Sequence, residues 1–137
     1  MKLSQVMTGG LETVAPQASL SEAAAKMANR DVGSLPVTAG ARIIGIITDR
    51  DITVRAVACG LDPNATKVEE VMTREVLSCP ADADVRAAMQ LMEERQVRRL
   101  VVTDGEAPVG IVSLGDLALC MRAHDSGEVL KRVSEPH

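Results

Sequence analysis

A hydroxyl residue followed three positions later by a carboxylate occurs twice in this sequence, each time after a short apolar run. The pairs are Thr48 with Asp51 in GIITDRD and Ser113 with Asp116 in GIVSLGD. Each run predicts a short buried strand that leads into a helix. The hydroxyl at this junction can cap the helix, and the free N–H groups of the first turn can hold an anion. The carboxylate is placed to accept hydrogen bonds from a vicinal diol such as a ribose, so each copy could hold a nucleotide. The same pattern also describes a helix-capping box with Asp in place of Glu, which would have a structural role only.

The two copies belong to a longer internal repeat with a constant offset of 65 residues. The offset relates Val6, Met7 and Thr8 to Val71, Met72 and Thr73, Ala23 and Met27 to Ala88 and Met92, and Leu35, Val37 and Thr38 to Leu100, Val102 and Thr103. This constant register indicates two copies of one strand–helix–strand–strand–helix unit. One such unit is too small to bury the face of its sheet alone. We therefore expect an α+β fold in which the copies pack sheet to sheet around a pseudo-twofold axis.

The elements of the first copy can be placed from capping residues and hydrophobic periodicity. A capping box at 19–22 opens an amphipathic helix, and strands are expected at 34–38 and 42–48. A second helix should run from Asp49 to about Cys59, with Gly60 as its C′ residue. The buried stripe expected on the first helix consists of Leu20, Ala23, Ala24, Met27 and Ala28. A further capping box, Thr66 to Glu69, starts a short turn over 68–72. The expected division of the chain is a first repeat at 1–60, a linker at 61–67, a second repeat at 68–124 and a C-terminal tail at 125–137.

The composition excludes several classes of function. The 137 residues are 46% apolar but include no Phe, Trp or Tyr, so any flat ligand must lie between aliphatic side chains. The lack of stacking platforms argues against single-stranded nucleic acid, and a net charge of −4 gives no attraction to phosphate polymers or anionic membranes. No signal peptide and no membrane-spanning run is recognisable, which predicts a cytoplasmic protein. The thiols of Cys59, Cys79 and Cys120 are expected to be free, and neither a metal cluster nor a nucleophile–base pair around His124 stands out.

The order of these motifs resembles that of a CBS domain, and it does so twice. The first copy has Met7-Thr8, then Leu35-Pro36-Val37, then GIITDRD. The second has Met72-Thr73, then RRLVV from Arg98, then GIVSLGD. The match extends from about Leu3 to Met121, and the stretch TDRDI through GLDP also resembles small standalone bacterial pairs of CBS domains, including mycobacterial stress- or hypoxia-response members.

The resemblance implies a tandem pair, or Bateman module, that binds adenosine-containing ligands such as AMP, ADP or ATP, and in some members S-adenosylmethionine or NAD. In the family, each cleft combines the Ser/Thr-x-x-Asp of one repeat with the start and second strand of the other. The first cleft would use Thr48 near phosphate, Asp51 on ribose, Val76, Leu77 and Val97 beside the base, and Arg98 and Arg99 toward phosphate. Arg50 is close enough to this phosphate site to be included, and the alternative is that it belongs to the charged surface of its helix. The second would use Ser113 and Asp116, with Thr8, Thr13 and Val32 near the base. Met7 and Met72 could touch a base or pack in the core.

The second cleft departs from this pattern in its charge. The counterparts of Arg98 and Arg99 in the first repeat are Gly33 and Ser34, and Gly115 stands where Arg50 stands in the first copy. We therefore expect the second cleft to hold a polyphosphate less well than the first.

The sequence as a whole predicts a non-catalytic regulatory module with an adenine nucleotide as ligand and no obligatory cofactor. Family members commonly form flat dimers through their helices, which implies a homodimer whose output passes to an effector protein in trans. The alternative is a structural or interaction dimer with empty clefts and a stress-response or thiol-linked role. An enzyme is not expected.

Overall fold

The computed structural model describes residues 1–7 and 11–125, which form two compact units. One unit is Glu12–Val76, and the other combines the described residues of 1–11 with those of 77–125. Each unit has its own hydrophobic core. Each unit thus contains most of one repeat together with the start of the other repeat.

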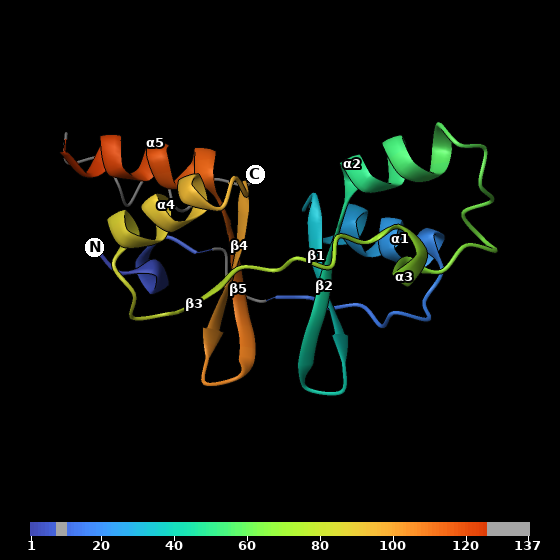
Figure 1. The fold of residues 1–137 in the computed structure, drawn as a ribbon, viewed down its shortest axis with the longest axis horizontal. Coiled ribbons are helices and arrows are strands. Elements are labelled where there is room, and N and C mark those ends of the chain that lie inside the picture. The colour runs from blue at the N-terminus through green and yellow to red at the C-terminus, as the bar shows by residue number, and fades with distance from the viewer. Residues whose placement is uncertain (8–10, 126–137) are drawn as a thin grey trace. The chain divides into compact units, whose positions relative to one another are not determined.

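The unit Glu12–Val76 is built around a two-stranded antiparallel hairpin (Figure 1). Its elements are α1 (Leu20–Arg30), β1 (Ser34–Ala39), β2 (Arg42–Thr48), α2 (Asp49–Asp51), η2 (Ile52–Val57) and α3 (Val68–Val71). Strands β1 and β2 pair from Ser34 with Thr48 to Ala39 with Arg42, with a bulge between Val37 and Thr38. This pairing carries Thr48 to the end of the hairpin at which the next helix begins.

Helix α1 begins and packs largely as its sequence predicts. The Ser19 hydroxyl accepts a hydrogen bond from the backbone N–H of Glu22 (3.1 Å), which caps the first turn. Leu20, Ala23 and Met27 are buried against the hairpin. Ala24 and Ala28 were expected on the same stripe but are exposed, because a sheet of two strands covers only a narrow face of the helix.

The second helix of this unit is not a regular α-helix. One α-helical turn, α2, is followed by a π-helix over Ile52–Val57, in which the Ala58 N–H donates to the Thr53 carbonyl at 3.0 Å. The run of β-branched residues at 52–54 crowds the tighter α winding, which explains why the predicted single helix is replaced here. Gly60 follows with φ +73°, as expected of a C′ residue.

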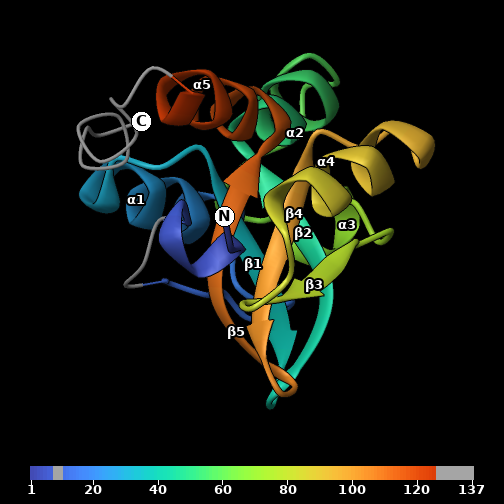
Figure 2. The same cartoon turned by 90° about the vertical axis from the view of Figure 1, so that its left-hand side faces the viewer.

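The second unit has a three-stranded sheet in the order β3-β4-β5, with β3 parallel to β4 and β4 antiparallel to β5. Its elements are η1 (Leu3–Gln5), β3 (Ser78–Pro80), α4 (Val85–Glu94), β4 (Arg99–Asp104), β5 (Ala107–Ser113) and α5 (Leu114–Asp125). Helices α4 and α5 lie on one face of this sheet (Figures 1 and 2). The N-terminal turn η1 is fixed beside α4, because the Leu3 N–H donates to the Ala83 carbonyl at 2.9 Å.

Backbone details recur at the predicted offset of 65 residues, which confirms an α+β fold built from two copies of one unit. Asp31 and Gln96 end the first helix of each copy with φ values of 54° and 56°. The bulge between Val37 and Thr38 has its counterpart between Val102 and Thr103. Packing of the two sheets against each other stays a prediction.

The start of each repeat lies against the second strand of the other repeat. A Cβ at Gly45 would lie 2.7 Å from the Met72 sulfur and 2.9 Å from the Thr73 carbonyl oxygen, so the backbone excludes a larger residue there. A Cβ at Gly110 would lie 2.6 Å from the Met7 sulfur, so the Met7 side chain would have to move. Thr73 and Ile46 exchange two backbone hydrogen bonds, each of 2.9 Å. Met72 is 5% exposed, which favours core packing for this side chain. The capping box of α3 lies one residue later than expected, since the Lys67 N–H donates to Glu70 Oε2 at 2.6 Å.

Candidate functional site

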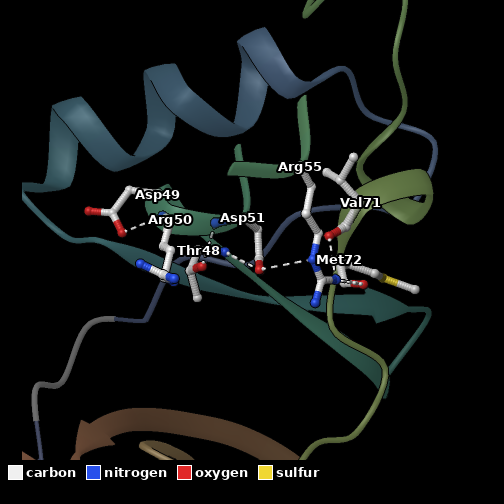
Figure 3. Close-up of polar contacts among 7 residues, drawn as sticks. All are labelled: Thr48, Asp49, Arg50, Asp51, Arg55, Val71 and Met72. Atoms are coloured by element: carbon white, nitrogen blue, oxygen red, sulfur yellow. Dashed lines mark hydrogen bonds and ion pairs between the residues drawn. The ribbon is translucent and has the colours of Figure 1, made fainter. Parts of the chain in front are cut away.

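The junction between β2 and α2 holds a carboxylate in a fixed orientation. The Asp51 N–H donates to Thr48 Oγ1 at 3.0 Å, and the Thr48 N–H donates to Asp51 Oδ2 at 3.1 Å (Figure 3). The two residues are 7% and 9% exposed. Both bonds are buried, so they resist competition from water and leave the carboxylate little rotational freedom. The expected capping box is therefore present, and it presents the second carboxylate oxygen, Oδ1, in one direction.

The second oxygen of Asp51 faces an arginine that sequence reasoning did not place in the site. The Nε of Arg55 lies 3.9 Å from Asp51 Oδ1, one helical turn further along the chain. The Nη1 of Arg55 donates to the carbonyls of Val71 (3.2 Å) and Met72 (3.4 Å) (Figure 3). The i, i+4 spacing of the acidic and basic residues was the signal that could have identified this pair.

The first-turn N–H groups of α2 are not free to hold an anion, which corrects the expectation from the sequence. The N–H of Asp49 donates to the Gly33 carbonyl at 2.9 Å, and the N–H of Arg50 donates to Asp49 Oδ1 at 2.8 Å. The N–H of Asp51 is taken by the Thr48 hydroxyl. The exposed Asp49 carboxylate thus occupies the place that a phosphate would take at this helix end.

The same unit contains the other residues expected from the first half of the chain. Arg50 is exposed and extends to the opposite side of Thr48 from Arg55 (Figure 3). The Thr13 carbonyl accepts a hydrogen bond from Lys26 Nζ at 2.8 Å. Val32 is half-buried against the core of this unit, and Val76 is also half-buried.

The other unit contains the corresponding junction at Ser113. The Asp116 N–H donates to Ser113 Oγ at 3.1 Å, and the Leu114 N–H donates to the Arg98 carbonyl at 2.8 Å. Arg99 is the direct cross-strand partner of Ser113 in the sheet. The structure therefore brings the Arg98-Arg99 pair to the hydroxyl junction of its own unit.

The remaining expected residues of this unit lie at the edge of its core. Leu77 and Val97 are half-buried and pack against the core of buried residues. Thr8, expected near the base of the second cleft, lies outside the described residues. The expected clefts each draw residues from both units, and that joint arrangement stays a prediction.

The two junctions carry different charges. Asp49 lies over Gly33, where a Cβ would approach its Oδ2 to 2.9 Å. At the offset of 65, Leu114 replaces Asp49 and Arg98 replaces Gly33. The junction at Ser113 therefore lacks the acidic residue and has a basic residue instead. The counterpart of Arg55 is Cys120, which is buried.

The three cysteines differ in exposure. Cys59 is exposed, whereas Cys79 and Cys120 are buried, and burial raises the pKa of the Cys79 thiol. Among the residues that the structure describes, no group of three or more His, Cys, Asp or Glu side chains could hold a metal ion. No helix in the described part of the chain has the length and apolar character needed to cross a membrane.

Comparison with known proteins places both repeats in one family. The model of the CBS domain matches residues 3–57 and 68–122. The chain is 39% identical to the CBS domain-containing protein YhcV of Bacillus subtilis over 133 residues, which cover 96% of this chain and 94% of the relative. It is 33% identical to Hypoxic response protein 1 of Mycobacterium tuberculosis over 132 residues, which cover 96% of this chain and 92% of the relative.

A solved structure with the same fold contains adenosine derivatives. This is the CBS domain pair of protein MJ0100 in complex with 5′-methylthioadenosine and S-adenosyl-L-methionine. It matches with a TM-score of 0.77 and 25% identity, covering 90% of this chain and 98% of that chain.

Proposed function

The chain belongs to the CBS domain family as a tandem regulatory pair, and we propose that it binds an adenine nucleotide of the AMP, ADP or ATP type. The fixed orientation of the Asp51 carboxylate is the observation that carries this proposal. A carboxylate whose Oδ2 is occupied by the chain can use Oδ1 to accept hydrogen bonds from the two hydroxyls of a ribose. The adenosine ligands of the related MJ0100 pair support the same ligand class.

The ligand would be recognised by its sugar and phosphate more than by stacking. The chain has no Phe, Trp or Tyr, so the base would lie between aliphatic side chains such as Val76 and Leu77. Since the first-turn N–H groups of α2 are occupied, phosphate would be held by side chains. Arg98 and Arg99 are the positive groups proposed for this role, and Thr48 and Arg50 are the further polar groups proposed to contact phosphate.

Signalling would proceed through conformation or dimer geometry to an effector protein in trans, in the cytoplasm. A ligand can shift such an equilibrium only by the difference in its affinity for the two states. Val54 and Leu119, at equivalent positions of the two repeats, are 47% and 42% exposed. These apolar side chains support a homodimer formed through the helices that follow β2 and β5.

A structural or interaction protein with empty clefts is the second candidate. The hydrogen bonds between Thr48 and Asp51 favour it, because they satisfy one carboxylate oxygen and the helix cap without any ligand. In that case the apolar helix surfaces would carry the function and the carboxylate would serve the fold alone.

Calorimetric titration with AMP, ATP, NAD and S-adenosylmethionine separates the two candidates. The sensor predicts saturable binding of at least one of these ligands. Replacement of Asp51 by Asn keeps an acceptor for the Thr48 N–H but removes the charge, and should weaken binding about tenfold or more. The double replacement Arg98→Ala with Arg99→Ala should weaken AMP binding more than adenosine binding. Asp82→Asn, an exposed carboxylate, is the matched control and should have no effect. Absence of binding to all four ligands would support the structural protein.

A further inference from the structure

Arg55 joins two parts of the chain that a nucleotide sensor needs to connect. Its guanidinium faces the Asp51 carboxylate through Nε at 3.9 Å. The same group donates through Nη1 to the carbonyls of Val71 and Met72 at 3.2 and 3.4 Å. These carbonyls lie at the end of α3 and are followed directly by Thr73, in the segment that opens the second repeat. One side chain therefore contacts both the candidate ribose acceptor and the start of the second repeat.

The contact is specific to the first repeat. The residue 65 positions later is Cys120, which is buried in the core of its unit. The helix that carries Arg55 is wound as a π-helix at this point, whereas α5 is described as an α-helix throughout. Single π-helical turns occur frequently at functional sites, where they redirect a side chain.

We propose that Arg55 is a positioning residue that links the Asp51 carboxylate to the chain at Val71–Met72. It orients Oδ1 toward the ligand and holds the start of the second repeat in the same arrangement. The part of this proposal that concerns ligand binding rests on the proposed function. A change at the carboxylate, whether by a bound ribose or by a substitution, is transmitted through the guanidinium to the backbone that follows Met72.

The physical basis is the sharing of one cation between acceptors. The guanidinium offers N–H donors in a planar fork, so it can serve a carboxylate and two carbonyls at once. When a ribose hydroxyl donates to Oδ1, that oxygen interacts less strongly with Nε. The backbone carbonyls are neutral acceptors, and their hold on Arg55 depends on the orientation that the carboxylate provides.

The ligand-binding arm of the test uses AMP and 2′-deoxy-AMP as probes. Wild-type protein should prefer AMP because the 2′-hydroxyl donates to the carboxylate. Arg55→Met should reduce this preference about threefold or more, and Arg55→Lys should restore part of it. Arg42→Met, at an exposed position in the β1–β2 hairpin, is the matched control and should leave the preference unchanged. An equal loss of affinity for both nucleotides in Arg55→Met would show a structural role only and would overturn the proposal.

A second experiment, done without ligand, tests the role of Arg55 independently of nucleotide binding. Hydrogen exchange of the Thr73 amide, which is bonded to the Ile46 carbonyl at 2.9 Å, reports on the held segment. Arg55→Met should accelerate this exchange about threefold to tenfold relative to Arg42→Met. Asp51→Asn should accelerate it in the wild-type background but not in the Arg55→Met background, because the link is then already lost.

The two arms distinguish the possible failures. If wild-type protein binds neither nucleotide, the proposed function fails, and the exchange measurement alone decides whether Arg55 links the two parts. If Asp51→Asn leaves the exchange of Thr73 unchanged, or changes it equally with and without Arg55, the link does not exist.

Discussion

The capping hydroxyl of Thr48 should contribute more to stability than its counterpart in the other unit. Thr48→Val preserves the shape of the side chain but removes the oxygen that accepts the Asp51 N–H. Thr48 and Asp51 are 7% and 9% exposed, so water cannot replace the lost acceptor. The cost of an unsatisfied buried N–H is about 1–3 kcal/mol, and loss of a Thr cap costs about 0.5–2 kcal/mol. Both ranges describe the same bond and are not added, so we expect the free energy of unfolding to fall by about 1.5 kcal/mol.

The corresponding change at the other junction should cost less. Ser113 and Asp116 are only half-buried, so water can reach the Asp116 N–H when Ser113→Ala removes its acceptor. We expect a loss of about 0.5–1 kcal/mol. The difference between the two variants reports how strongly burial isolates the Asp51 N–H from solvent, compared with the Asp116 N–H.

Urea unfolding followed by far-ultraviolet circular dichroism measures both decreases in stability, since the chain has no Trp or Tyr for fluorescence. Thr38→Val is the matched control because Thr38 is half-buried in β1, and the same exchange of hydroxyl for methyl removes no cap there. A Thr48→Val variant within about 0.3 kcal/mol of this control would refute the reasoning, because the hydroxyl would then not be a required acceptor.

Three further outcomes follow from the same structure. Asp49→Asn keeps an acceptor for the neighbouring N–H but removes a charge from the helix end, so calorimetry should show AMP affinity raised about twofold to fivefold and adenosine affinity unchanged. Gly45→Ala places a methyl 2.7 Å from the Met72 sulfur and 2.9 Å from a backbone oxygen, so urea unfolding should show a loss of about 1–3 kcal/mol. Burial raises the pKa of the Cys79 thiol, so the folded state favours the protonated thiol. This preference stabilises the fold below the ordinary thiol pKa, and the stabilisation is lost as pH rises above about 8.5. Denaturation as a function of pH should show that loss in wild type but not in Cys79→Ala, and iodoacetamide should modify the exposed Cys59 first.

The internal repeat was predictable because each copy uses the same local chemistry at the same spacing. The φ values of Asp31 and Gln96 agree to within a few degrees, although the two residue types differ. The hairpin bulges also recur in register. Such features depend on the steric demands of short segments, and a constant offset in the sequence is sufficient to reveal them.

The contacts of Arg55 could not be predicted in the same way. Its acceptors at Val71 and Met72 lie 16 and 17 residues further along the chain, and only the folded unit brings them together. The local sequence shows the acidic partner one turn earlier, but it does not show that the same guanidinium reaches a distant backbone. The π-helical winding of Ile52–Val57 is also not visible in a helical periodicity, although the β-branched residues at 52–54 disfavour a regular α-helix.

The acceptors of the first-turn N–H groups of α2 could not be predicted for a related reason. The sequence identifies three N–H groups at the end of β2, but it does not identify their acceptors. Gly33, Asp49 and Thr48 supply these acceptors within the same unit. A helix end that satisfies its own donors leaves recognition of a phosphate to side chains, which is why the proposed phosphate contacts are arginines.

The start of each repeat packs against the second strand of the other repeat. Met72 packs on Gly45 and Thr73 pairs with Ile46, so the segment that opens the second repeat is bound to the strand that ends at Thr48. Under the proposal for Arg55, a change at the carboxylate of Asp51 would reach the start of the second repeat within one compact unit. Neither repeat contains this contact by itself, because the strand and the segment that it holds come from different copies. Duplication thus supplies the physical contact that the proposed coupling of binding to response requires.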